Sequence, residues 1–267
     1  MSASKLFYRH PLWVRVTHWL NFLCMIVLLM SGLQIFNAHP ALYWGQKSDF
    51  DHPFLSINSV EDDQGHESGV TTIAGHSFNT TGLLGLSGGG DRAFPQWATL
   101  PHLQWLAMGR RWHFFLAWIF VINGAIYVLT SLIGRHLRGD LLPTRADLAH
   151  IGRSIAEHVR LRFPKGDEAK RYNVLQKLAY LIVAFLLGPV MVLAGLTMSP
   201  RIDASYPILL EVFGGRQSAR TIHFILAFSF LGFFAIHIVM VLLSGVFNNL
   251  RSMITGWYNL GDKREHA

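Results

Sequence analysis

Cysteine is almost absent from this chain of 267 residues: Cys24 is the single one, and it lies within an apolar run. One cysteine cannot form an intrachain disulfide framework, and it cannot supply the thiolate cluster that a zinc or iron–sulfur centre requires. The sequence therefore excludes a disulfide-stapled domain and a cysteine-ligated metal site.

Charged residues are also scarce. They make up 15% of the chain, whereas hydrophobic residues make up 51%, and the mean hydropathy is +0.30. These values are typical of membrane proteins. The net charge of +7 is better explained by basic loops beside membrane spans than by nucleic acid. The first apolar run lacks a small-x-small cleavage site, so we interpret it as a retained span rather than a signal peptide.

Four apolar runs are long enough to cross roughly 30 Å of hydrocarbon as helices. We place these spans at about 14–36, 113–133, 175–198 and 222–246. Gly188 and Pro189 are expected to kink the third. The sequence thus predicts an all-α integral membrane protein, a four-transmembrane-helix bundle forming a single domain over 1–267. The chain has no internal repeat, which argues against a small proton-relaying transporter.

Loop charge predicts the orientation. Residues 134–177 hold ten Lys/Arg against five Asp/Glu, whereas residues 37–104 hold two against seven. Basic connections lie on the cytoplasmic side. We therefore expect a cytoplasmic loop at 134–174, an extended periplasmic loop at 37–104, and both termini in the cytoplasm of a bacterium, with the protein in its inner membrane.

The cytoplasmic loop contains apolar residues at three- and four-residue spacing with arginines between them. This pattern predicts a short amphipathic helix, which either lies on membrane lipid or packs as a solvated helix on its neighbours. The residues are Leu148, Ile151, Ile155, Val159, Arg153, Arg160 and Arg162.

The outer connection of nearly seventy residues is long for a simple link and indicates a docking surface. Gly82–Gly90 is expected to be loop, and Trp97 and Trp105 to be interfacial anchors. We interpret the histidines of this connection as ordinary loop residues: His39, His52, His66, His76 and His102.

Histidines inside the spans indicate a functional site, because ionisable residues are costly there. His223 and His237 lie fourteen residues apart in the last apolar run. Fourteen helical residues rise roughly 21 Å and make just under four turns, so both imidazoles leave one face.

Each of these histidines has a predicted partner at its own depth. His18 and His237 both lie near the cytoplasmic surface, while His113 and His223 both lie near the outer surface. Two stacked bis-histidine haem b groups need this arrangement, since each iron takes one imidazole from either side and is then closed to substrate. Zinc would instead need three or four ligands at one site.

Further residues are candidates for the haem surroundings. Small residues that would permit close approach are Ser31, Gly32, Gly124, Gly195 and Gly232. Arginines that could bind propionates are Arg15 on the inner side and Arg110, Arg111, Arg216 and Arg220 on the outer side. Each arginine is equally explained as an ordinary membrane-flanking residue.

These motifs resemble the di-haem cytochrome b subunits of nickel–iron hydrogenases, membrane formate dehydrogenases and thiosulfate reductases. The likeness rests on the Arg15-Val-Thr-His18-Trp19 start, the Arg-Trp-His113 start, the His223/His237 pair and the Arg171–Tyr180 segment entering the third span. The resemblance implies the same histidine pairing that depth predicts.

The resemblance also implies electron exchange between a redox partner outside the cytoplasmic membrane and the quinone pool. It places a quinone near the inner haem, with Asn173 as the best candidate to donate a hydrogen bond to a quinone carbonyl. Weaker candidates are Gln176, Lys177 and Tyr180; interfacial anchoring is the alternative for all four.

The long outer loop favours a molybdenum oxidoreductase (a molybdopterin enzyme) or a c-type cytochrome as partner over a hydrogenase, although a hydrogenase cytochrome b subunit stays an alternative. Another alternative is a stand-alone quinone-linked oxidoreductase resembling superoxide oxidase. The seven acids of the outer loop argue against it, because they would repel an anionic substrate.

Overall fold

The structure is a computed structural model that describes residues 6–87, 90–134, 137–160 and 172–260. Four helical stretches in these ranges are long and apolar enough to cross a membrane. They are α1 (Leu12–Phe36), α2 (Leu106–Ile133), the segment Val174–Thr197, and α9 (Arg216–Leu243). Few of their apolar side chains are buried, and none in the most apolar window of α9. Helices that are apolar on every side and packed on few neighbours are suited to lipid.

Two helices begin about two turns before the predicted spans. Helix α2 begins at Leu106 and α9 at Arg216, whereas hydropathy predicted starts at 113 and 222. The added turns contain arginines, which lower hydropathy but are good helix formers. His113 and His223 therefore each lie about two turns inside their helices, and the points where the membrane spans begin stay a prediction.

The third stretch is broken in the middle, as Pro189 predicted. It consists of α5 (Val174–Leu181), a π-helical segment η4 (Ile182–Leu187) and α6 (Gly188–Thr197). Proline lacks an N–H and its ring clashes with the carbonyl four residues earlier. A π-helical turn before Pro189 accommodates both effects.

The chain forms two compact units. We call residues 21–121 and 190–227 the sheet unit, and residues 1–20, 122–189 and 228–267 the terminal unit. Each of the four long helices contributes residues to both units.

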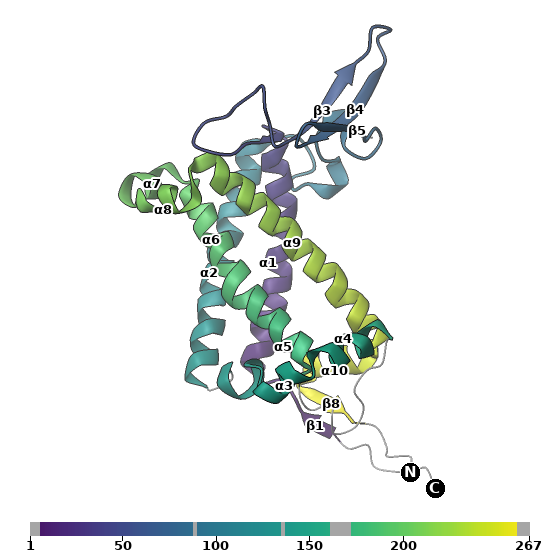
Figure 1. Ribbon diagram of the computed structural model, residues 1–267, viewed down its shortest axis with the longest axis vertical. Coiled ribbons are helices and arrows are strands. Elements are labelled where there is room, and N and C mark those ends of the chain that lie inside the picture. Colours follow the sequence, from purple (N-terminus) through teal and green to yellow (C-terminus); the bar gives the residue numbers. More distant parts are fainter. Residues whose placement is uncertain (1–5, 88–89, 135–136, 161–171, 261–267) are drawn as a thin grey trace. The chain divides into compact units, whose positions relative to one another are not determined.

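In the sheet unit, much of the predicted outer loop is β-structure (Figure 1). An antiparallel sheet has the order β2–β3–β4–β5, and β6 pairs with β7. The strands are β2 (Ala41–Leu42), β3 (Leu55–Glu61), β4 (Glu67–Ile73), β5 (His76–Asn79), β6 (Gly85–Ser87) and β7 (Gly90–Arg92).

The expectation that Gly82–Gly90 is loop was wrong for β6 and for Gly90, the first residue of β7. Gly85 has a positive φ of 79°, and a Cβ there would lie 2.5 Å from the carbonyl oxygen of Asn58. Glycine at this position therefore permits close packing of the strands. From composition alone, the same glycine-rich segment is expected to be a loop.

The sheet unit has a small aromatic core and one buried arginine. Phe36, Leu42, Ile57, Ala93 and Phe94 pack together. Arg92 donates to Gln34 Oε1 at 2.9 Å and to the carbonyl of His102 at 2.7 Å. The short helices of this unit are η1 (Gln96–Ala98), α7 (Pro200–Ser205) and α8 (Ile208–Phe213).

The terminal unit joins the two ends of the chain. Strand β1 (Leu6–Tyr8) pairs antiparallel with β8 (Trp257–Asn259). Its other elements are η2 (Leu137–Leu141), α3 (Arg145–Ala149), α4 (Ile151–Val159) and α10 (Val246–Thr255).

Helix α4 covers Ile151–Val159 of the segment predicted to be one amphipathic helix, whereas Leu148 belongs to α3. Leu148 and Ile155 are each 48% exposed, so apolar surface is available there. Arg162 and the side chain of Val159 lie outside the described part of the chain. Contact with lipid therefore stays a prediction.

Candidate functional site

The four span histidines form two pairs, one in each unit. In the terminal unit the ring centroids of His18 and His237 lie 6.2 Å apart, with an interplanar angle of 58°. In the sheet unit those of His113 and His223 lie 6.2 Å apart, with an angle of 63°. The structure thus brings together the same partners that loop charge and helix direction indicate.

This spacing fits a metal ion between the rings. A bound metal lies about 2 Å from an imidazole nitrogen, so two imidazoles on opposite sides of one ion have centroids about 6 Å apart. Within the described ranges, no group of three or more His, Cys, Asp or Glu side chains gathers as a metal site. Two imidazoles on opposite sides are the ligand set of a six-coordinate haem iron.

Backbone carbonyls orient the rings of the sheet-unit pair. His113 Nδ1 lies 3.2 Å from the carbonyl oxygen of Leu28 and 3.1 Å from Ser31 Oγ. His223 Nδ1 lies 3.0 Å from the carbonyl oxygen of Met191. A carbonyl only accepts, so Nδ1 carries the proton in both rings. Each Nε2 then presents its lone pair as a metal ligand.

Two glycines make room for these rings. A Cβ at Gly32 would lie 3.4 Å from His113 Cε1, and one at Gly195 would lie 3.2 Å from His223 Cε1. A Cβ at Gly124 or Gly232 would meet nothing within 4 Å. Of the small residues that the sequence singles out, Gly32 and Gly195 therefore fit closely against imidazoles.

The terminal-unit pair is supported differently. His18 Nδ1 is buried and, within the described residues, has no hydrogen-bond partner. The ring of His18 meets Trp19 edge-on at 5.3 Å, and the ring of His237 stacks on Phe233 at 5.9 Å. Aromatic packing is thus the observed support for these rings.

Three of the arginines that were predicted to bind propionates form hydrogen bonds or an ion pair within the protein. Arg15 Nη1 donates to the carbonyl of Ile254 at 2.5 Å. Arg220 donates to the carbonyls of His39 and Ala41 at 2.6 and 3.0 Å. Arg216 pairs with Asp203 at 3.2 Å.

Other guanidinium groups of these arginines remain candidates for binding propionates. Arg15 Nε is buried with no partner within the described part of the chain. Arg110 and Arg111 are exposed. Most of these arginines therefore bond to other residues of the protein. Propionate binding stays a prediction.

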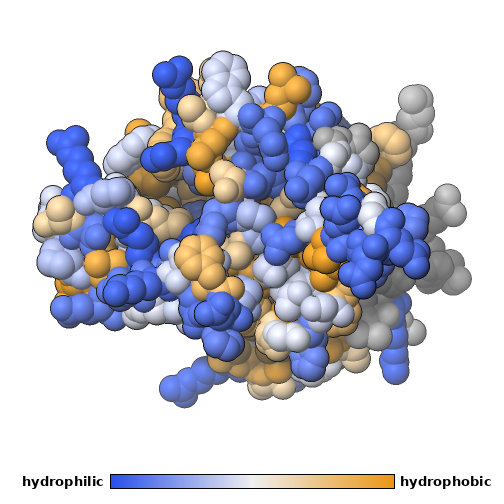
Figure 2. Space-filling view, turned by 90° about the horizontal axis from the view of Figure 1, so that it is seen from above, coloured by the Kyte–Doolittle hydropathy of each residue, from blue (hydrophilic) through white to orange (hydrophobic). Residues whose placement is uncertain are grey.

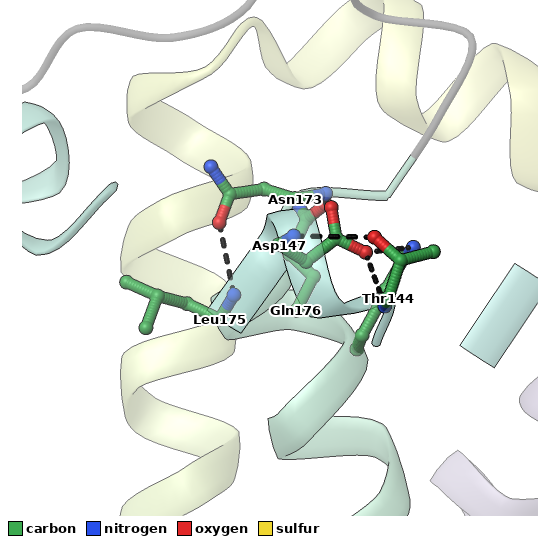
Figure 3. Close-up of polar contacts among 6 residues, drawn as sticks. Thr144, Asp147, Asn173, Leu175 and Gln176 are labelled. Atoms are coloured by element: carbon green, nitrogen blue, oxygen red, sulfur yellow. Dashed lines mark hydrogen bonds and ion pairs between the residues drawn. The ribbon is translucent and has the colours of Figure 1, made fainter. Parts of the chain in front are cut away.

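Asn173 begins α5 as its N-cap (Figure 3). Its Oδ1 accepts from the backbone N–H of Leu175 at 2.9 Å, and Gln176 Oε1 accepts from the backbone N–H of Asn173 at 3.1 Å. This capping box uses the oxygen of each amide. The NH₂ groups stay available as donors, and Figure 3 shows the amide nitrogen of Asn173 directed away from the capping bond.

Lys177 is tied to the α3 segment. Its Nζ lies 2.9 Å from Asp147 Oδ2, and the Lys177 side chain is only 10% exposed. Asp147 and Thr144 form a capping box on α3. The Lys177 hydrogen bond, followed by that from the Thr144 N–H, lowers the pKa of Asp147 to about 2. Asp147 is therefore a fixed anion near neutral pH. Tyr180, the remaining quinone candidate, packs edge-on against Tyr172 at 5.4 Å.

The loop histidines do not gather into a site. His52 and His66 pair with Asp49 and Asp62 at 3.3 and 3.4 Å on the surface. Burial, and then Arg220, lowers the pKa of His39. His76 and His102 are exposed.

Sequence reasoning missed two kinds of contact. The carbonyl acceptors at Leu28 and Met191 are backbone groups and carry no residue signal. Arg9 lies 5.7 Å from the ring centre of Tyr172 and 4.8 Å from that of Tyr258. The pairing of the chain's two ends sets this cation–π cluster, which no local pattern reveals.

Four long apolar helices indicate a multi-pass membrane protein, and the spacing of the two imidazole pairs fits haem iron. The chain matches the family described as prokaryotic cytochrome b561 over residues 9–256, and it belongs to that family. It is therefore a membrane haem protein of b type with a role in electron transfer.

One curated relative matches along nearly the whole chain. It is the "Putative protein-methionine-sulfoxide reductase subunit YedZ1" of Azospira oryzae, 27% identical over 255 residues, which cover 95% of this chain and 99% of the relative. No solved structure matches the chain.

Proposed function

We propose that the chain holds two haem b groups, one between His18 and His237 and one between His113 and His223, and passes electrons between a periplasmic redox partner and quinone. The observation that carries this proposal is the 6.2 Å separation of two imidazole ring centroids, which occurs in both pairs. Helix α9 supplies one histidine to each pair.

A haem with two imidazole ligands supplies one-electron transfer without an open position for substrate. The residues of the chain bind and orient it. The Nε2 atoms of the four histidines would hold the iron, while Leu28, Ser31 and Met191 orient the rings of His113 and His223 through Nδ1. Arg15 is the propionate candidate on the inner side, and Arg111 and Arg220 are the candidates on the outer side.

The quinone site lies at the start of α5 in this proposal. Asn173 donates its free amide N–H to a quinone carbonyl, and Gln176 supplies a second donor from the same capping box. Lys177 stays paired with Asp147 and holds the α3 segment beside these donors. The protons that quinone reduction consumes come from the cytoplasmic loop.

The sheet unit faces the periplasm and both termini face the cytoplasm of a bacterial inner membrane. Loop charge supports this orientation. The partner is a periplasmic oxidoreductase, with a molybdenum enzyme as the leading class, and the reductase-subunit name of the relative agrees with such a complex. In Figure 2 the face seen from above Figure 1 is rich in hydrophilic residues with hydrophobic groups between them.

The quinone link is tested with purified protein in lipid nanodiscs. Anaerobic addition of a short-chain quinol should reduce the b-type haem, as followed by its absorbance. Asn173→Ser keeps an N-cap acceptor but removes the amide donor, so reduction should slow about tenfold while the haem content is unchanged. Asn248→Ser is the matched control, since Asn248 caps no span and instead bonds to Asn259. Wild-type haem that a quinol cannot reduce, or equal rates in both variants, would contradict this site.

A further inference from the structure

The two histidine pairs differ in the hydrogen bonds of their Nδ1 atoms, and this difference concerns Ser31. We infer that Ser31 is a positioning residue that lowers the reduction potential of the outer haem. The inference rests on the proposed ligation of that haem by His113 and His223.

Ser31 is fully buried on α1. Its Oγ lies 2.6 Å from the carbonyl of Val27, 3.2 Å from that of Leu28 and 3.1 Å from His113 Nδ1. The hydroxyl has one proton, and the shortest contact directs it to Val27. The lone pairs of Oγ are then free to accept from His113 Nδ1–H.

His113 therefore shares one N–H between two acceptors, Ser31 Oγ and the Leu28 carbonyl. An acceptor on Nδ1–H makes the imidazole a more electron-rich ligand at Nε2. Such a ligand stabilises ferric iron relative to ferrous iron. One electron reduces the iron in this couple, and the ligands and the Nδ1 proton stay in place, so the effect appears directly in the midpoint potential.

The terminal-unit pair provides the contrast. His18 Nδ1 has no hydrogen-bond partner within the described residues, whereas both rings of the sheet-unit pair have an acceptor. On this basis the outer haem has the lower potential of the two. Ser31 contributes the side-chain part of that difference, and the carbonyls of Leu28 and Met191 contribute the backbone part.

The test is an optical redox titration of wild-type protein and three variants, with the haem content of each measured first. Ser31→Ala removes one acceptor from His113 and should raise the potential of the outer haem. At a fixed ambient potential, loss of one hydrogen bond should change its ferrous-to-ferric ratio about fivefold. That ratio corresponds to about 40 mV for a one-electron couple. The inner haem should not shift.

Two variants separate tuning from packing. Ser31→Thr keeps the hydroxyl and should titrate like the wild type. Thr197→Val removes another fully buried hydroxyl of the sheet unit, whose hydrogen bond goes to its own helix at Leu193, and should shift neither haem.

An unchanged outer potential in Ser31→Ala, an equal shift in Thr197→Val, or loss of the outer haem in Ser31→Ala would overturn the role of Ser31. Wild-type protein with fewer than two haems would instead overturn the ligation itself, so the two failures are distinct.

Discussion

The two histidine pairs have the same spacing but different surroundings. Both place ring centroids 6.2 Å apart. In the sheet unit, backbone carbonyls fix the Nδ1 atoms of His113 and His223. In the terminal unit, aromatic rings pack on His18 and His237. Imidazole spacing and imidazole electronics are therefore set separately. The helices that carry the histidines determine the spacing, and the neighbours of Nδ1 determine how electron-rich each imidazole is.

The largest effect should come from removing one histidine of each pair. His113→Ala should abolish only the outer haem, and His237→Ala only the inner one, because each ligand belongs to a single pair. Haem-to-protein ratio by pyridine haemochrome, together with low-temperature spectra, measures this. His76→Ala, at an exposed strand residue, is the control. If either span variant disturbed both haems equally, or neither, the pairing would be wrong.

A smaller effect is expected from adding a methyl group beside His223. The Cβ of Gly195→Ala would lie 3.2 Å from Cε1 of that ring, so the imidazole must move and outer-haem affinity should fall about tenfold. Gly232→Ala is the matched control and should keep its haem, since the added Cβ would meet nothing within 4 Å. Haem retention during gel filtration compares the two. Equal retention would show that the outer ring has room to adjust.

The smallest effect concerns the ion pair between Lys177 and Asp147. The folded-state pKa of Asp147 is lowered to about 2 from its ordinary value of 3.8. The carboxylate thus stabilises the fold above about pH 4, and this contribution disappears as the pH falls from 4 toward 2. Asp147→Asn should cost about 1 kcal/mol at pH 7 and much less near pH 2.

Thermal unfolding followed by circular dichroism measures this difference. Glu157→Gln, which breaks the exposed pair with Arg153, should change stability little at either pH. A pH-independent deficit in Asp147→Asn would mean that the carboxylate acts through its Thr144 cap and not through its charge.

The sequence was informative where side chains repeat with helical spacing. The fourteen-residue separation of His223 and His237, combined with loop charge, predicted which histidines the structure brings together. Hydropathy located the four long helices but shortened α2 and α9, because it treats Arg110, Arg111 and Arg216 as loop rather than as helix formers.

Other features depend on backbone groups or on distant segments. The carbonyls that hold His113 and His223 belong to residues whose side chains are not involved, so no residue type marks them. Strands β6 and β7 have three residues each and begin with glycine, a composition that also describes loops. The role of Gly85 becomes clear only beside Asn58.

The most direct test of the central claim is the haem content and spectrum of purified wild-type protein. We expect two haem b groups per chain, both low-spin in the ferric and ferrous states, with two midpoint potentials in a redox titration. One haem per chain, or a high-spin signal from a haem that lacks one imidazole, would contradict it.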